Sequence, residues 1–404
     1  MSQRPPRAKG RGADWTVFSP QAHPGATKEP RRKAARQERP EASGTNRAPG
    51  GEWEDAVSCL SVTLRRGGLR YLGILGSAAV AAAVVLAGCN QAAAPSSAVT
   101  GSAPSLTLAQ AQAAYDSYVT ASTAAAKRGD AAQGLAVVAD EQWSIAHAQY
   151  TAHATSGTPV TRYSYGTPIF YVPALSGYPQ WFMVAVPART DTAGQLGPAV
   201  DTVMVFVRSA RSEQFTLDGS VVLDQPLPAI ARDRAGYATQ VSTGDQGLLL
   251  QPNTVGPAQA AVVDQGPTAA AAAVMASGPQ TTALHAAQAA RGNAAAARGL
   301  NYQWLLEGAA FAQWGLRTAG GGALVLYAMY LNTTTAHPNN VSGSPIPVPA
   351  SFTPLLATPN QIGYHQVTAN WTYEFAAVDP PQAAHGAKVE VIGGSGAPTY
   401  GYAH

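Results

Sequence analysis

The stretch Val200-Asp-Thr-Val-Met-Val-Phe-Val-Arg208 decides the fold class, because β-branched and aromatic residues dominate it and no Gly or Pro interrupts it. Similar segments surround it, separated by the Pro and Gly clusters that are typical of turns: Thr167–Val172, Gln180–Val186 and Gln214–Leu223. The pattern predicts an antiparallel sheet whose strands follow one another along the chain.

Helical patterns precede these strands. Apolar residues recur at helical spacing from Thr107, whose side chain can cap a first turn, to Gly129, which favours the end of a helix. A second helix is predicted from about Ala131 to Ala152. Helices followed by a run of strands indicate an α+β fold.

The second half of the chain repeats this plan. Ala258-Gln-Ala-Ala-Val-Val-Asp264 is similar to Ala111-Gln-Ala-Ala-Tyr-Asp116, which lies 147 residues earlier, and Gly322–Tyr330 follows the Gln180–Val186 segment by 142. The offset grows once, at a Pro-rich loop from Thr335 to Pro359, as a tandem duplication predicts. Chance similarity between Ala-rich segments is the alternative.

We therefore expect two related α+β domains, residues 107–245 and 246–404. In each, helices pack on an antiparallel sheet. This arrangement resembles cystatin-like and NTF2-like domains, a likeness of pattern that implies no function.

The segment before the folded part has the layout of a secretory signal. A basic group that includes Arg65 and Arg66 precedes an Ala- and Gly-rich apolar run that ends at Leu86-Ala87-Gly88-Cys89. The run is barely long enough to cross a bilayer, which makes a permanent transmembrane helix the weaker interpretation.

Leu86-Ala87-Gly88-Cys89 resembles the lipobox of bacterial lipoproteins. The resemblance implies that a diacylglyceryl group is attached to the Cys89 thiol and that the chain is cut just before it. We therefore expect a lipid anchor at the outer face of the cell membrane. Arg65-Arg66 is also similar to a twin-arginine signal, although Gly68 replaces the usual bulky residue, so both export routes stay open.

The charge of the chain changes at this motif. Residues 1–88 carry 14 Lys/Arg and 7 Asp/Glu, a net of +7, whereas residues 89–404 carry 12 and 16, a net of −4. Because the basic part precedes the cut, we expect no nucleic-acid partner. Residues 1–60 are expected to be a disordered basic tail that lies outside the true start, residues 61–88 the signal peptide, and residues 89–106 the lipidated cysteine and a flexible tether. With Cys59 removed, no disulfide or cysteine metal site is expected.

Two further segments, Gly320–Tyr330 and Trp371–Ala377, follow the lipobox-like motif later in the chain. Together they resemble a family of actinobacterial surface lipoproteins of unknown function, over most of residues 107–404. The resemblance implies no activity for individual residues.

The sequence contains no recognised catalytic motif. Gly393-Gly-Ser-Gly-Ala397 lacks the last glycine of a nucleophile elbow, no His-Glu-x-x-His occurs, and Gly320-Gly-Gly322 precedes a strand, as a hairpin turn does. Asp116 and Asp140-Glu141 are expected on solvated helix faces. We expect no catalytic residue, no metal site and no cofactor.

Trp304, Trp314 and Trp371 are the candidate pocket residues. Core packing explains them adequately, and the functional alternative is an apolar pocket between helix and sheet. We expect a non-catalytic lipoprotein that binds or scaffolds an envelope protein or cell-wall partner. A small-molecule or lipid carrier is the second hypothesis, and an enzyme is the third.

Overall fold

The computed structural model describes residues 106–192, 194–358 and 360–404. The predicted tail, signal peptide and anchor lie outside them, including Arg65, Arg66 and Leu86-Ala87-Gly88-Cys89.

Helix α1 (Leu108–Arg128) begins and ends where the sequence predicts. The Thr107 hydroxyl accepts a hydrogen bond from the Gln110 N–H at 3.2 Å, and the Gln110 side chain accepts one from the Thr107 N–H at 2.9 Å. This capping box satisfies N–H groups that a first helical turn leaves free. Gly129 ends the helix at φ +65°, a left-handed conformation that favours glycine.

The prediction of one helix from Ala131 to Ala152 is wrong, because two helices occupy this range: α2 (Ala131–Leu135) and α3 (Asp140–Ser156). Between them the chain pairs with strand β6 (Thr216–Val222). The Leu217 N–H donates to the Val137 carbonyl at 3.0 Å, and the Ala139 N–H donates to the Leu217 carbonyl at 2.8 Å. Extended pairing of this kind is incompatible with a continuous helix.

The first sheet is antiparallel, with the order β1-β3-β5-β6, while β2 and β4 also pair with β3. The predicted segments at Gln180 and Val200 are confirmed as strands. The bounds are β1 (Arg162–Tyr165), β2 (Ile169–Tyr171), β3 (Gln180–Thr192), β4 (Gln195–Leu196), β5 (Val200–Arg208) and β6 (Thr216–Val222).

The second sheet is also antiparallel, with the order β11-β10-β9-β7, and β8 pairs with β9. As predicted, Gly320-Gly-Gly322 forms the turn of the β8–β9 hairpin. The strands are β7 (Asn301–Gly308), β8 (Trp314–Arg317), β9 (Ala323–Ala336), β10 (Gln366–Asp379) and β11 (Glu390–Ala403); the helical segments are α4 (Pro252–Gln265), η1 (Ala270–Ala273), η2 (Pro279–Ala283), α5 (Leu284–Ala296), η3 (Pro338–Asn340) and η4 (Ala350–Leu355).

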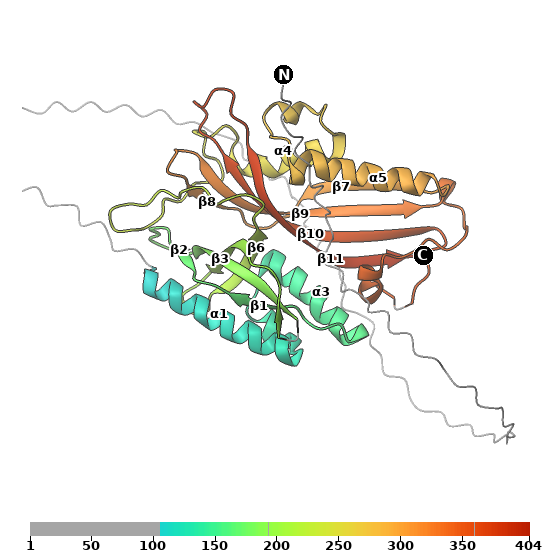
Figure 1. Ribbon diagram of the computed structural model, residues 1–404, viewed down its shortest axis with the longest axis horizontal. Helices are drawn as coiled ribbons and strands as arrows, with labels where there is room; N and C mark the ends of the chain where they lie inside the picture. The colour runs from blue at the N-terminus through green and yellow to red at the C-terminus, as the bar shows by residue number, and fades with distance from the viewer. Residues whose placement is uncertain (1–105, 193, 359) are drawn as a thin grey trace, which may run out of the picture. The chain divides into compact units, whose positions relative to one another are not determined.

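Alternation along the long strands divides the side chains between layers. On β3, Phe182 and Val184 face α1, whereas Trp181 and Met183 share a core with second-sheet residues such as Leu326. The opposite face of the second sheet packs against α4, and α5 lies against β7 (Figure 1). The α+β class is confirmed, with two helix-covered sheets that meet through a shared core.

Candidate functional site

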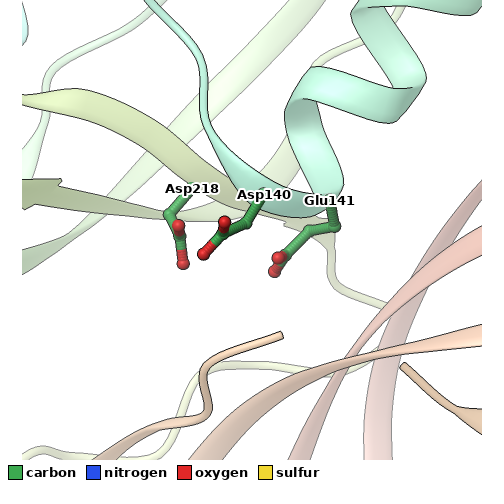
Figure 2. Close-up of side chains that lie close together, drawn as sticks. All are labelled: Asp140, Glu141 and Asp218. Carbon is green, nitrogen blue, oxygen red and sulfur yellow. The ribbon is translucent and has the colours of Figure 1, made fainter. Parts of the chain in front are cut away.

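Three carboxylates converge where α3 begins. Asp140 and Glu141 are the first residues of α3, and Asp218 lies on β6. Oxygen atoms from the three side chains all lie within 4.8 Å of one another. Figure 2 shows the three carboxyl groups side by side, extending in the same direction from their backbones.

Two local irregularities create this cluster. The pairing of Val137–Ala139 with β6 directs the start of α3 toward that strand, and Asp140 adopts φ +43° there. On β6 the register skips one residue, because Val205 pairs with Gly219 and Phe206 pairs with Leu217. Asp218 is therefore the extra residue of a β-bulge, a feature that redirects a side chain.

The expectation that Asp140-Glu141 lies on a solvated helix face is wrong for Glu141. Its side chain is only 3% exposed, and Asp218 is fully buried, whereas Asp140 and Asp116 are exposed. Glu141 is buried because α3 lies against β6, β10 and β11, and this contact depends on segments distant in sequence.

Hydrogen bonds connect the acidic groups to the second sheet. The Trp314 indole N–H donates to Asp218 Oδ2 at 2.5 Å. On β10, both oxygens of Glu374 accept from Gln142 Nε2 at 2.7 Å, and Glu374 is 1% exposed. Residues from both halves of the chain thus form one polar cluster.

Burial changes the acidity of these groups. Desolvation raises the pKa of Asp218 to about 7, against the lowering effect of the Trp314 hydrogen bond. Desolvation likewise raises the pKa of Glu374 to about 8, although the Gln142 hydrogen bond opposes it. The pKa of Glu141 is also raised well above its ordinary value, first by burial and then by repulsion from Glu374 and Asp218.

The cluster has no cationic side chain to balance it among the residues that the structure describes. The ion pairs found among the described residues involve carboxylates outside the cluster, namely Asp130, Asp191 and Asp245. Glu141 Oε2 and Asp218 Oδ1 are buried and accept no hydrogen bond from the described chain. Such groups are costly to bury unless a proton or another cation compensates them.

A hollow of about 540 Å³ adjoins the cluster, with Asp140 and Trp314 in its wall. A second hollow of about 460 Å³ lies along β7 and is lined in part by Tyr302, Trp304 and Leu305.

The structure does not bring the three predicted pocket tryptophans together. Trp304 belongs to the hollow along β7, and Trp314 to the carboxylate cluster. Trp371 packs against Phe352 in the core between the second sheet and its covering segments.

Sequence reasoning did not identify Asp218, Glu374 or Gln142. Asp218-Gly219 has the composition of a turn, which concealed its place inside a strand. Glu374, an acid in the otherwise apolar and aromatic Trp371–Ala377 segment, was the available signal.

In the part of the chain that the structure describes, no helix combines the length and the hydropathy needed to span a membrane. A protein described as an uncharacterized lipoprotein, from Streptomyces avermitilis, is 28% identical to this chain over 179 residues. The match covers 43% of this chain and 49% of the relative, so the chain spans about half the length of that curated relative. The similarity to this relative confirms the lipoprotein resemblance and supports membrane association.

The model of a family described as a domain of unknown function (DUF8094) matches residues 102–400. This range includes the carboxylate cluster and every described helix and strand except the end of β11, which runs to Ala403. The chain therefore belongs to the DUF8094 family.

Proposed function

We propose that the protein is a lipoprotein anchored at the outer face of the cell membrane, where its folded unit has a non-catalytic binding or scaffolding role. The similarity to a lipoprotein supports the anchor, and Leu86–Cys89 provides the thiol for a diacylglyceryl group. Residues 90–106 would then separate the membrane from the fold.

Burial of the acidic groups is the observation that carries the non-catalytic role. A general acid or base must come within about 3 Å of the proton that it transfers. Glu141, Asp218 and Glu374 are at most 3% exposed, which gives a sugar ring or a peptide bond little access to their oxygens and supports this role. Asp140 is the exposed acid of the cluster. This geometry favours the binding of a proton, a water molecule or a single ion over the turnover of a large substrate.

We place the contact with an envelope protein or cell-wall partner at the hollow along β7. The hollow is lined by Leu305, which is 49% exposed, and by Tyr302 and Trp304, which are partly buried. Aromatic residues are enriched at protein interfaces, and this hollow combines them with an exposed aliphatic side chain.

A carrier of small apolar molecules is the second candidate, because the same hollow of about 460 Å³ falls within the usual size range of ligand sites. One experiment separates the two. A photoreactive amino acid replaces Leu305 in living cells, and Leu196, which is 54% exposed on β4, is the control position. A protein or glycan adduct specific to position 305 supports binding, and a lipid-sized adduct supports a carrier. Adducts at neither position, or equally at both, contradict the proposed contact.

The anchor has a separate test. Cys89→Ala should abolish labelling by a fatty-acid probe and release the protein from the membrane fraction, whereas Cys59→Ala, which changes a cysteine ahead of the proposed cut, should have no effect. Protease added to intact cells should digest the wild-type protein. Labelling that survives Cys89→Ala, or protection from the protease, would contradict the anchor or its orientation.

We also propose that the two halves arose by tandem duplication and share a cystatin-like or NTF2-like pattern. Three neighbouring strands follow the same order in each sheet, β3-β5-β6 and β9-β10-β11, with β6 and β11 at the end of that order. In both sheets two short preceding strands pair with the free side of the first long strand. Helices precede the strands in each half. Superposition of the two halves through these strands tests the duplication.

A further inference from the structure

We propose that Asp140, Glu141 and Asp218 bind a divalent cation of the Ca²⁺ type between the start of α3 and the bulge of β6. The distances fit one ion. Ca²⁺ binds oxygen at about 2.3–2.6 Å, so two oxygens on the same ion are at most about 5 Å apart. The three carboxylates meet this limit, since their oxygens lie within 4.8 Å of one another.

Unpartnered oxygens point independently to a ligand. Trp314 donates to Asp218 Oδ2 but leaves Oδ1 buried and without a hydrogen bond, and Glu141 Oε2 is in the same condition. Both side chains are at least 97% buried, and both extend into the space that Asp140 also faces (Figure 2). A cation would satisfy the two oxygens together.

Two irregularities of the backbone accompany this cluster of carboxylates, one at Asp140 and one at Asp218. A backbone φ of +43°, as at Asp140, is uncommon for a residue other than glycine and is typical of functional positions. The bulge at Asp218 disrupts the ladder between β5 and β6 and brings a second carboxylate to the same point. Together the two irregularities bring the three side chains to one place.

The donor set selects the kind of cation. All three groups are carboxylates, so the site favours a hard cation over the softer metals that prefer imidazole or thiolate. Mg²⁺ requires a near-ideal octahedron and retains several waters, whereas Ca²⁺ accepts irregular geometry and bidentate carboxylates. A cluster with two fully or nearly buried acids suits Ca²⁺ better.

The hollow of about 540 Å³ gives the ion a route to the cluster, because Asp140 forms part of its wall. Once bound, the ion would join α3 to β6. The hydrogen bonds of Asp218 to Trp314 and of Gln142 to Glu374 would connect it to the second sheet. This inference is independent of the proposed partner at β7.

Terbium luminescence tests the site in the purified full chain. Tb³⁺ is the probe, because it replaces Ca²⁺ and emits when a nearby indole transfers energy to it. The Trp314 nitrogen is 2.5 Å from a proposed ligand, so excitation of tryptophan should produce strong emission at one ion per chain. Ca²⁺ should displace Tb³⁺ at lower concentration than Mg²⁺ does. Absence of sensitised emission, or the reverse order of displacement, would overturn the assignment.

Three variants make the test specific. Asp140→Asn should weaken Tb³⁺ and Ca²⁺ binding about tenfold or more, and it should fold, because Asp140 is exposed and asparagine tolerates positive φ. Asp218→Asn should have at least the same effect, with circular dichroism to check its folding. Asp116→Asn, at an exposed position on α1, is the matched control. If Asp140→Asn binds Ca²⁺ as the control does, the proposal is wrong.

Discussion

Asp379 provides a quantitative test of how the burial of a carboxyl group changes the free energy of unfolding with pH. It is the last residue of β10 and is fully buried. Its two carboxylate oxygens accept from the Leu250 N–H at 3.3 Å, in the segment that enters α4. Burial raises the pKa of Asp379 to about 6, although hydrogen bonds from the Leu250 and Leu249 N–H groups oppose the increase.

The raised pKa defines a pH window. The ordinary value is 3.8, so the folded state holds a proton more tightly than the unfolded state does. The stabilisation is fully present below about pH 4 and is lost as the pH rises through about 6. The increase of this pKa from 3.8 to about 6 corresponds to about 3 kcal/mol, which we take as an upper limit for this group.

Asp379→Asn removes the titration and keeps one oxygen that can accept from Leu250. We expect the variant to gain stability relative to the wild type as the pH rises from 4 to 7, by up to about 3 kcal/mol. Urea unfolding at constant ionic strength across this range measures the difference. Asp116→Asn gives the background for the same change of charge at an exposed position.

A difference between Asp379→Asn and the wild type that stays constant from pH 4 to pH 7 would refute the reasoning. So would a difference that moves in the opposite direction, because hydrogen bonding to the charged form would then outweigh desolvation. A difference of the expected sign that matches the Asp116→Asn background would assign the effect to net charge and not to burial.

Three other substitutions test separate parts of the fold by urea unfolding. Trp314→Phe removes the N–H that donates to buried Asp218 and should lower the free energy of unfolding by about 2 kcal/mol. Its control is Trp143→Phe, at a side chain that is 44% exposed, which should change the free energy of unfolding by less than about 0.5 kcal/mol. Equal effects of the two substitutions would contradict the role of the hydrogen bond. Thr107→Ala should cost about 1 kcal/mol by removing the cap of α1, and no loss would show that the cap is dispensable. Phe375→Ala should cost about 3–5 kcal/mol because the ring is fully buried, and a loss below about 1 kcal/mol would contradict its place in the core.

Features encoded by neighbouring residues could be predicted from the sequence. The ends of α1 depend on Thr107, Gln110 and Gly129, which act within a turn of each terminus. The bounds of β5 match the predicted Val200–Arg208 stretch, because a run of β-branched residues has few other favourable conformations. The turn at Gly320–Gly322 is equally local.

Features that depend on distant pairing could not be predicted. The break between α2 and α3 exists because Val137 and Ala139 hydrogen-bond to Leu217, about 80 positions away in the chain. Composition alone favours a continuous helix there. The same pairing places the start of α3 against β6, and the contacts of α3 with β10 and β11 complete the burial of Glu141. Both errors, in the helix and in the site, therefore arise from contacts between segments distant in the sequence.

The carboxylate cluster lowers the stability of the folded protein, because its buried acids have no cationic partner among the described residues. Buried acids without cationic partners are less stable than apolar side chains of similar volume, and the raised pKa values of Asp218 and Glu374 have the same origin. Such sites are typical of function, because stability alone would favour their replacement. Here the acids come from α3, β6 and β10, and their hydrogen bonds cross from one half of the chain to the other. A proton or cation that neutralises them would therefore stabilise the junction of the two sheets in particular.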